Sequence, residues 1–173
     1  MAPAESEELA AILRPYEALE TELCALAPVP DLANLRASLS AVFPWLGAVT
    51  DFVLKSLAVS AQGDGAFRTR PVLLLGDPGV GKTAYANFLC RSSGIPSRTL
   101  ALAGKSDSRD LVGTARGWGT RQPGLALRLI AESRLANPLI ILDEIDKAGG
   151  SRDNGNIQVA VLHLLEPESA RAI

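Results

Sequence analysis

The sequence predicts an α/β protein in which a parallel β-sheet is flanked by helices, with a helical segment at the N-terminus. Two apolar runs, residues 71–75 and 138–142, have the length and composition of buried strands. A glycine-rich turn follows the first run and leads into a helical pattern over residues 84–90. A helical pattern over residues 125–132 leads into the second run, which ends in two acidic residues. Strands that alternate with helices in this way favour a parallel sheet.

Length, charge and composition restrict the class of protein. A chain of 173 residues is typical of one domain, and its formal charge of −2 gives no electrostatic reason to expect nucleic acid or an anionic membrane as a partner. The sequence contains no run of about 20 apolar residues. Residues 1–8 are acidic and lack the basic start and apolar core of a signal peptide. We therefore expect a cytoplasmic protein that binds neither nucleic acid nor membrane.

Residues 1–43 are expected to form a helical N-terminal segment. Apolar residues recur every three or four positions from Leu9 to Leu26, and Pro15 either kinks this helix or begins a new one. Asp31 is expected to cap a second helix over residues 32–42, and a third apolar stripe runs from Leu46 to Leu57. These stripes either pack on one another and on the following domain, or the first helix pairs with another chain.

Residues 76–83 follow the pattern G-x-x-x-x-G-K-T. Glycines let backbone N–H groups approach phosphate oxygens, and the following helix presents its positive end to the same anion. Lys82 is expected to reach the β- and γ-phosphates, and the Thr83 hydroxyl to ligate Mg²⁺. The alternative is a glycine turn that joins a strand to a helix and binds nothing. The residues expected to bind the cofactors ATP and Mg²⁺ are Gly76, Asp77, Pro78, Gly79, Val80, Gly81, Lys82 and Thr83.

The second motif is the run Pro-Leu-Ile-Ile-Leu-Asp-Glu over residues 138–144. A buried parallel strand would deliver its two acids to the ligand edge of the sheet. Asp143 is expected to hold Mg²⁺, usually through water, and Glu144 to polarise the attacking water. One acid for the metal and one for the nucleophile suit the hydrolysis of ATP. The alternative is a strand that ends in acids by coincidence.

A strand over residues 97–103 and a glycine-rich segment over residues 110–124 lie between the two motifs. Trp118 stands among the glycines of that segment, which suits a surface loop that presents an aromatic side chain. The alternative is a tryptophan that anchors a packed loop. The cysteines, Cys24 and Cys90, lie in helical patterns and are expected to be small buried hydrophobic residues.

From about Pro44 to its end, the chain resembles the ATPase module of Lon-type proteases within the AAA+ superfamily. Both nucleotide motifs are common to AAA+ proteins. Three other features are more typical of Lon-type modules. These are Asn137-Pro138 before the second strand, Asp146-Lys147 after it, and the Leu-Glu-Pro-Glu run of residues 165–168. The resemblance implies that residues 44–173 form the N-terminal part of an AAA+ P-loop ATPase domain. It also implies a ring of several copies and a protein substrate.

The same resemblance places Trp118 at the position of the aromatic residue that lines the central pore and grips the polypeptide. The neighbouring apolar position of that pair is Gly119 in this chain, which departs from the pattern. The chain also stops at Ile173, before the sensor-1 strand, arginine finger and helical lid of a complete module. No serine–lysine pair of a protease can be assigned. The sheet is therefore expected to be incomplete at its C-terminal side, with the two motif strands either separated by an empty slot or paired directly.

These features imply a parent protein that couples ATP hydrolysis to the remodelling or unfolding of protein substrates. Two alternatives stay open at this point. One is an ATPase of another AAA+ clade, such as a clamp loader or a DNA-acting motor. The other is a nucleotide-binding protein without turnover. An arginine finger contributes about 10³–10⁵ to the rate in related P-loop enzymes, so this chain alone is expected to hydrolyse ATP very slowly.

Overall fold

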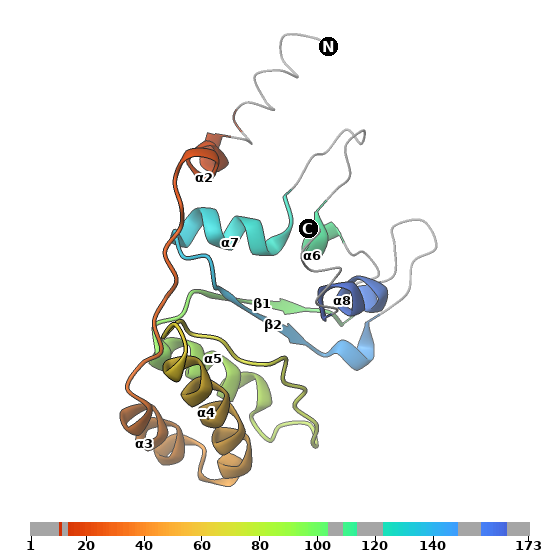
Figure 1. Cartoon of the computed structure of the whole chain (residues 1–173). Coiled ribbons are helices and arrows are strands. Elements are labelled where there is room, and N and C mark those ends of the chain that lie inside the picture. Colours follow the sequence, from red (N-terminus) through yellow and green to blue (C-terminus); the bar gives the residue numbers. More distant parts are fainter. Residues whose placement is uncertain (1–10, 12–13, 104–108, 114–122, 149–156, 166–173) are drawn as a thin grey trace. The chain divides into compact units, whose positions relative to one another are not determined.

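The computed structural model describes residues 11, 14–103, 109–113, 123–148 and 157–165 (Figure 1). In chain order its elements are η1 (Arg14–Tyr16), α2 (Glu17–Thr21), α3 (Leu32–Val42), η2 (Pro44–Leu46), α4 (Gly47–Gln62), α5 (Lys82–Ser93), β1 (Ser97–Ala101), α6 (Arg109–Val112), α7 (Leu125–Ser133), β2 (Leu139–Asp143), η3 (Ile145–Lys147) and α8 (Ile157–Leu165). Strands β1 and β2 run in the same direction and are hydrogen-bonded neighbours. Helices combined with parallel strands confirm the predicted α/β class.

The described residues form two compact units. The glycine-loop unit consists of Ala25–Thr99 and Leu135–Ile141, and the Asp143 unit contains the remaining described residues. No helix in the described ranges has both the length and the apolar character needed to cross a membrane.

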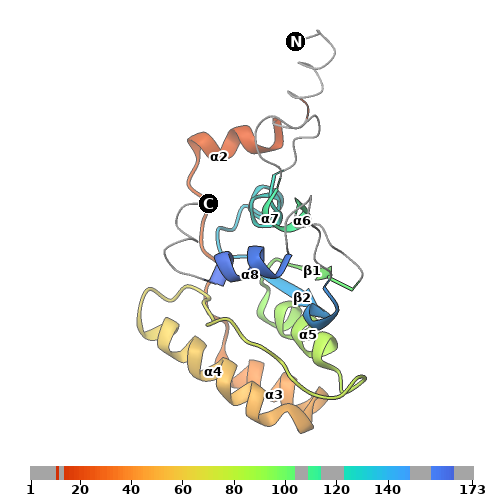
Figure 2. The same ribbon diagram turned by 90° about the vertical axis from the view of Figure 1, so that its right-hand side faces the viewer.

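The glycine-loop unit is organised around helices α3, α4 and α5, of which α3 and α4 lie side by side (Figures 1 and 2). Asp31 caps α3 as predicted, because its Oδ1 accepts a hydrogen bond from the Asn34 N–H at 2.9 Å. The apolar stripes of the three helices meet in one core, which confirms that the second and third stripes pack within the chain. The buried members of this core are Ala27, Leu35, Leu39, Phe43, Val53, Leu54, Leu57, Phe67, Tyr85, Leu89 and Ile95.

The two cysteines differ in their surroundings. Cys90 is fully buried on α5, as predicted, and burial raises the pKa of its thiol. Cys24 is only half-buried, and it lies after the end of α2 instead of within a helix. The predicted apolar stripe from Leu9 to Leu26 is therefore too long. Helix α2 ends at Thr21, and Leu23 beyond it is fully exposed.

The prediction of a buried strand over residues 71–75 is wrong. In the described part of the chain the sheet contains β1 and β2, and residues 71–75 are outside it. Leu74 packs against the core, but Leu73 and Leu75 are 68% and 84% exposed. A strand is stabilised by hydrogen bonds to a neighbouring strand, which apolar composition alone does not provide. The second motif strand, β2, pairs with β1 and not directly with this run.

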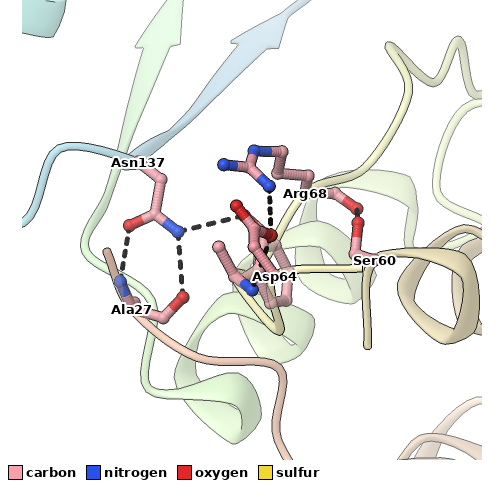
Figure 3. A network of polar contacts seen from close by, with 7 residues as sticks. Ala27, Ser60, Asp64, Arg68 and Asn137 are labelled. Atoms are coloured by element: carbon pink, nitrogen blue, oxygen red, sulfur yellow. Dashed lines mark hydrogen bonds and ion pairs between the residues drawn. The ribbon is translucent and has the colours of Figure 1, made fainter. Parts of the chain in front are cut away.

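Asn137, the residue before Pro138, joins three segments of the glycine-loop unit (Figure 3). Its Oδ1 accepts a hydrogen bond from the Ala27 N–H at 2.8 Å. Its Nδ2 donates to the carbonyl oxygens of Ala27 and Phe67, both at 3.0 Å. Because Ala27 and Phe67 are buried, these backbone groups need a partner inside the protein. The amide side chain thus fixes where the chain enters β2.

The Asp143 unit contains helices α6, α7 and α8. Helix α7 and strand β2 confirm the predicted helix over residues 125–132 and the predicted strand over residues 138–142. Gly113 and Pro123 form an antiparallel bridge, so the two ends of the segment between them meet. A Cβ atom on Gly124 would come within 3.1 Å of the Leu111 and Val112 backbone, which explains why α7 begins after a glycine.

Candidate functional site

The glycine-rich loop of residues 76–81 leads directly into α5, whose first residue is Lys82. Gly79 and Gly81 have φ angles of 83° and 91°, in the left-handed region that residues with a Cβ atom rarely adopt. Nothing would lie within 4 Å of a Cβ on Gly79, so its backbone conformation, and not crowding, requires the glycine. The two glycines therefore allow the left-handed backbone turn that leads the chain into the N-terminus of α5, a 12-residue helix.

Lys82 folds back over the start of this loop. Its Nζ donates hydrogen bonds to the carbonyl oxygens of Gly76 at 2.8 Å and Asp77 at 2.9 Å. These bonds hold a cation at the mouth of the loop, next to the positive end of α5. Thr83 follows on the first turn of α5, where its carbonyl oxygen accepts a hydrogen bond from Asn87 Nδ2 at 2.9 Å. The first turn of the helix thus carries both a cation and a hydroxyl group.

Two aromatic residues that the sequence analysis did not select also contact this loop. The Phe43 ring lies against Gly81, since a Cβ on that glycine would be 3.7 Å from it. Trp45 Nε1 donates a hydrogen bond to the Val80 carbonyl oxygen at 3.0 Å. The sequence gives no spacing signal for these contacts, because Trp45 and Val80 are 35 positions apart. Only the packing of α3 against α4 and α5 brings them together.

The two acids of the second motif lie in the Asp143 unit. Asp143 is the last residue of β2, and its carbonyl oxygen accepts a hydrogen bond from the Leu102 N–H at 2.9 Å. Glu144 leaves the strand with φ 56° and ψ 44°, a left-handed conformation that is uncommon for a residue other than glycine. Such a conformation costs on the order of 1–3 kcal/mol and is concentrated at functional sites. The Glu144 side chain is exposed.

Lys147 is not among the predicted site residues, but it forms an ion pair with Glu144. Its Nζ, on the last residue of η3, donates to Glu144 Oε1, three positions earlier in the chain. The hydrogen bond and the charge of Glu144 raise the pKa of Lys147. Both side chains are exposed, so the pair contributes little to stability. The ion pair does, however, place a cation next to the predicted catalytic carboxylate of Glu144.

The structure thus gathers the eight predicted loop residues, Gly76 to Thr83, in one unit. Asp143 and Glu144 belong to the other unit. Trp118 lies outside the described residues. A hydroxyl oxygen on Thr83 and carboxylate oxygens on Asp143 are the hard donors that Mg²⁺ prefers, so the residue types fit this ion.

Comparison with known proteins agrees with the loop geometry. Residues 72–172 match the ATPase family associated with various cellular activities (AAA). The chain is 37% identical over 148 residues to Lon protease 1 of Sorangium cellulosum, which covers 79% of this chain and 18% of that protein. It is 38% identical over 99 residues to the peroxisomal Lon protease homolog 2 of Pichia angusta, covering 57% and 11%.

A third relative, the Lon protease of Frankia alni, is 34% identical over 146 residues, covering 80% of this chain and 17% of that protein. The chain therefore spans less than a fifth of the length of these three relatives. The family match extends over more than half of the chain and contains residues 76–83 and 143–144. The chain accordingly belongs to the AAA family of ATPases, as a module of the Lon type.

Proposed function

We propose that this module binds Mg·ATP on residues 76–83 and hydrolyses it within a larger, ring-forming parent protein. The observation that carries the proposal is the backbone of the loop, with Gly79 and Gly81 at positive φ immediately before α5. A loop of this kind can direct successive N–H groups at phosphate oxygens, and the helix that follows adds its positive end.

In this proposal Lys82 exchanges partners when nucleotide binds. Its Nζ now donates to the carbonyl oxygens of Gly76 and Asp77. Phosphate oxygens are stronger acceptors than these carbonyls because they carry charge. The Lys82 ammonium is therefore already held at the loop, and bound nucleotide would offer it the β- and γ-phosphates as stronger acceptors.

Hydrolysis is assigned to the acids at the end of β2. Mg²⁺, when bound, would neutralise charge that develops on the phosphates. Thr83 and Asp143 would hold the ion, Asp143 through water. Glu144 would accept a proton from the attacking water, and its left-handed backbone conformation, of a kind concentrated at functional sites, supports that role.

We further propose that the parent assembles with other copies and remodels protein substrates. The support comes from the relatives, which are named as Lon proteases. The same likeness favours this clade over a clamp loader or a DNA-acting motor. The cytoplasmic location expected from the sequence stays a prediction.

Lys82→Ala tests nucleotide binding. Loss of a charge-assisted contact should weaken Mg·ATP binding by about 1.5–3 kcal/mol, which is roughly a 10- to 150-fold increase in Kd measured by calorimetric titration. Lys55→Ala removes an exposed lysine from α4 in the same unit and should leave the Kd unchanged. Equal affinity of Lys82→Ala and the parent chain for Mg·ATP would contradict the proposed site.

Trp118→Ala tests the contact with polypeptide. In a ring-forming parent it should preserve basal ATPase activity and abolish substrate-stimulated unfolding, because an exposed aromatic can grip many sequences. The free energy of unfolding should change little. A core tryptophan would instead lose about 3–5 kcal/mol on truncation, and a loss of that size in denaturant melting would identify Trp118 as a packing anchor.

A further inference from the structure

The segment between α3 and α4 forms an aromatic bracket, Phe43 and Trp45, that contacts the glycine-rich loop. Phe43 is buried, and its ring packs edge-on against three other aromatic rings, with centroids 5.5 Å from Tyr85, 5.6 Å from Phe88 and 5.9 Å from Trp45. Tyr85 and Phe88 belong to α5, the helix that follows the loop. Phe43 therefore ties the bracket firmly to α5 and also touches Gly81.

Trp45 is fixed at one edge by Phe43 and at the other by the loop. The residue as a whole is 63% exposed, so burial of apolar surface does not explain its position. Its indole N–H instead donates to the Val80 carbonyl oxygen at 3.0 Å. Phe43 orients the ring, and the hydrogen bond then holds the Val80 carbonyl toward Trp45.

Holding that carbonyl also orients the next N–H group. The peptide between Val80 and Gly81 is planar and trans, since the described residues include no cis peptide bond. In a trans peptide the C=O and N–H bonds point in opposite directions. The Gly81 N–H therefore points away from Trp45. Gly81 is also free to rotate toward the reverse orientation, because glycine has no Cβ atom to oppose it.

We propose that Trp45 is a positioning residue for nucleotide binding: its indole N–H fixes the 80–81 peptide so that the Gly81 N–H is presented to a phosphate oxygen. Without this bond the peptide can turn and direct a carbonyl oxygen at the anion, which repels it. The segment that joins α3 to α4 thereby becomes part of the phosphate site. This inference rests on the proposed function, since it requires that phosphate binds at the loop.

Trp45→Phe tests the inference in the 173-residue chain, because it keeps an aromatic ring beside Phe43 and removes the N–H donor. The Kd for Mg·ATP, measured by calorimetric titration, should rise about three- to tenfold, the range of one neutral hydrogen bond. The matched control is Ser60→Ala, which removes a hydrogen bond from Ser60 Oγ to the Arg68 carbonyl oxygen and involves no residue of the loop. Its Kd should equal that of the parent chain.

A second measurement uses the parent chain and does not depend on the folding of a variant. The sequence has two tryptophans, so ¹H–¹⁵N spectra contain two indole signals, and the signal that Trp45→Phe removes belongs to Trp45. Titration with Mg·ATP should shift the Trp45 signal, with saturation at the calorimetric Kd. Lys82→Ala should remove the shift at the same nucleotide concentrations.

The outcomes separate the role of Trp45 from the proposed function. If the parent chain binds Mg·ATP and Trp45→Phe binds it equally well, the role of Trp45 is refuted while the proposed function stands. The same holds if calorimetry detects binding but the Trp45 signal does not move. If the parent chain fails to bind Mg·ATP at all, the proposed function is refuted and the role of Trp45 with it.

Discussion

Replacing Glu144 with glutamine in a ring-forming parent that contains this module should leave Mg·ATP binding intact and reduce ATP turnover about 10²–10⁴-fold. Glutamine has nearly the same size as glutamate but cannot accept a proton from water. The side chain is exposed and its only described ion pair is with Lys147, so its replacement should not unfold the protein. Steady-state turnover and calorimetric titration, measured on the same preparation, separate these two effects.

Asp146→Asn is the matched control for this experiment. Asp146 is another exposed acid, two positions further along in η3, so its replacement removes the same charge from the same turn. Turnover of Asp146→Asn should stay within about twofold of the parent, as expected for a surface substitution of about ±0.5 kcal/mol. If Glu144→Gln turns over ATP at the parent rate, another group accepts the proton and the assignment of Glu144 is wrong.

Asn137→Ala should lower the free energy of unfolding by roughly 2–3 kcal/mol, because it leaves buried backbone groups without partners. The Ala27 N–H would lose its bond to Oδ1, and the Phe67 carbonyl oxygen would lose its bond to Nδ2. The Ala27 carbonyl oxygen would also lose Nδ2 but would keep the hydrogen bond from the Phe67 N–H at 2.8 Å. Urea denaturation of the whole chain, followed by circular dichroism, measures the loss.

Two variants show whether the hydrogen bonds themselves are responsible. Asn137→Asp keeps an acceptor for the Ala27 N–H but turns a carboxylate oxygen toward two carbonyl oxygens, so it should destabilise at least as much as alanine. Ser60→Ala removes an exposed hydrogen bond from the same group of residues and should change stability by less than about 0.5 kcal/mol. Parent-like stability of Asn137→Asp would show that the amide donors contribute nothing.

The sequence was sufficient where local interactions decide the structure. Asp31 caps α3 because its carboxylate bonds to an N–H three residues away. Helices α5 and α7 follow from apolar residues at helical spacing. The conformations of Gly79 and Gly81 follow from the steric freedom of glycine in a motif whose spacing is fixed. The fold class and the AAA family were therefore predictable from the order of residues alone, and both predictions were confirmed.

The tertiary structure decided features that depend on partners distant in sequence. Residues 71–75 have the composition of a strand, but a strand also requires a neighbour, and none of the described residues pairs with them. Asn137 bonds to residues 70 and 110 positions away, so its motif could indicate a family resemblance but not a structural role. Trp45 reaches Val80 only because Phe43 holds the preceding segment against α5. Composition and spacing specify what a residue can bond to, whereas chain packing specifies which groups come within reach.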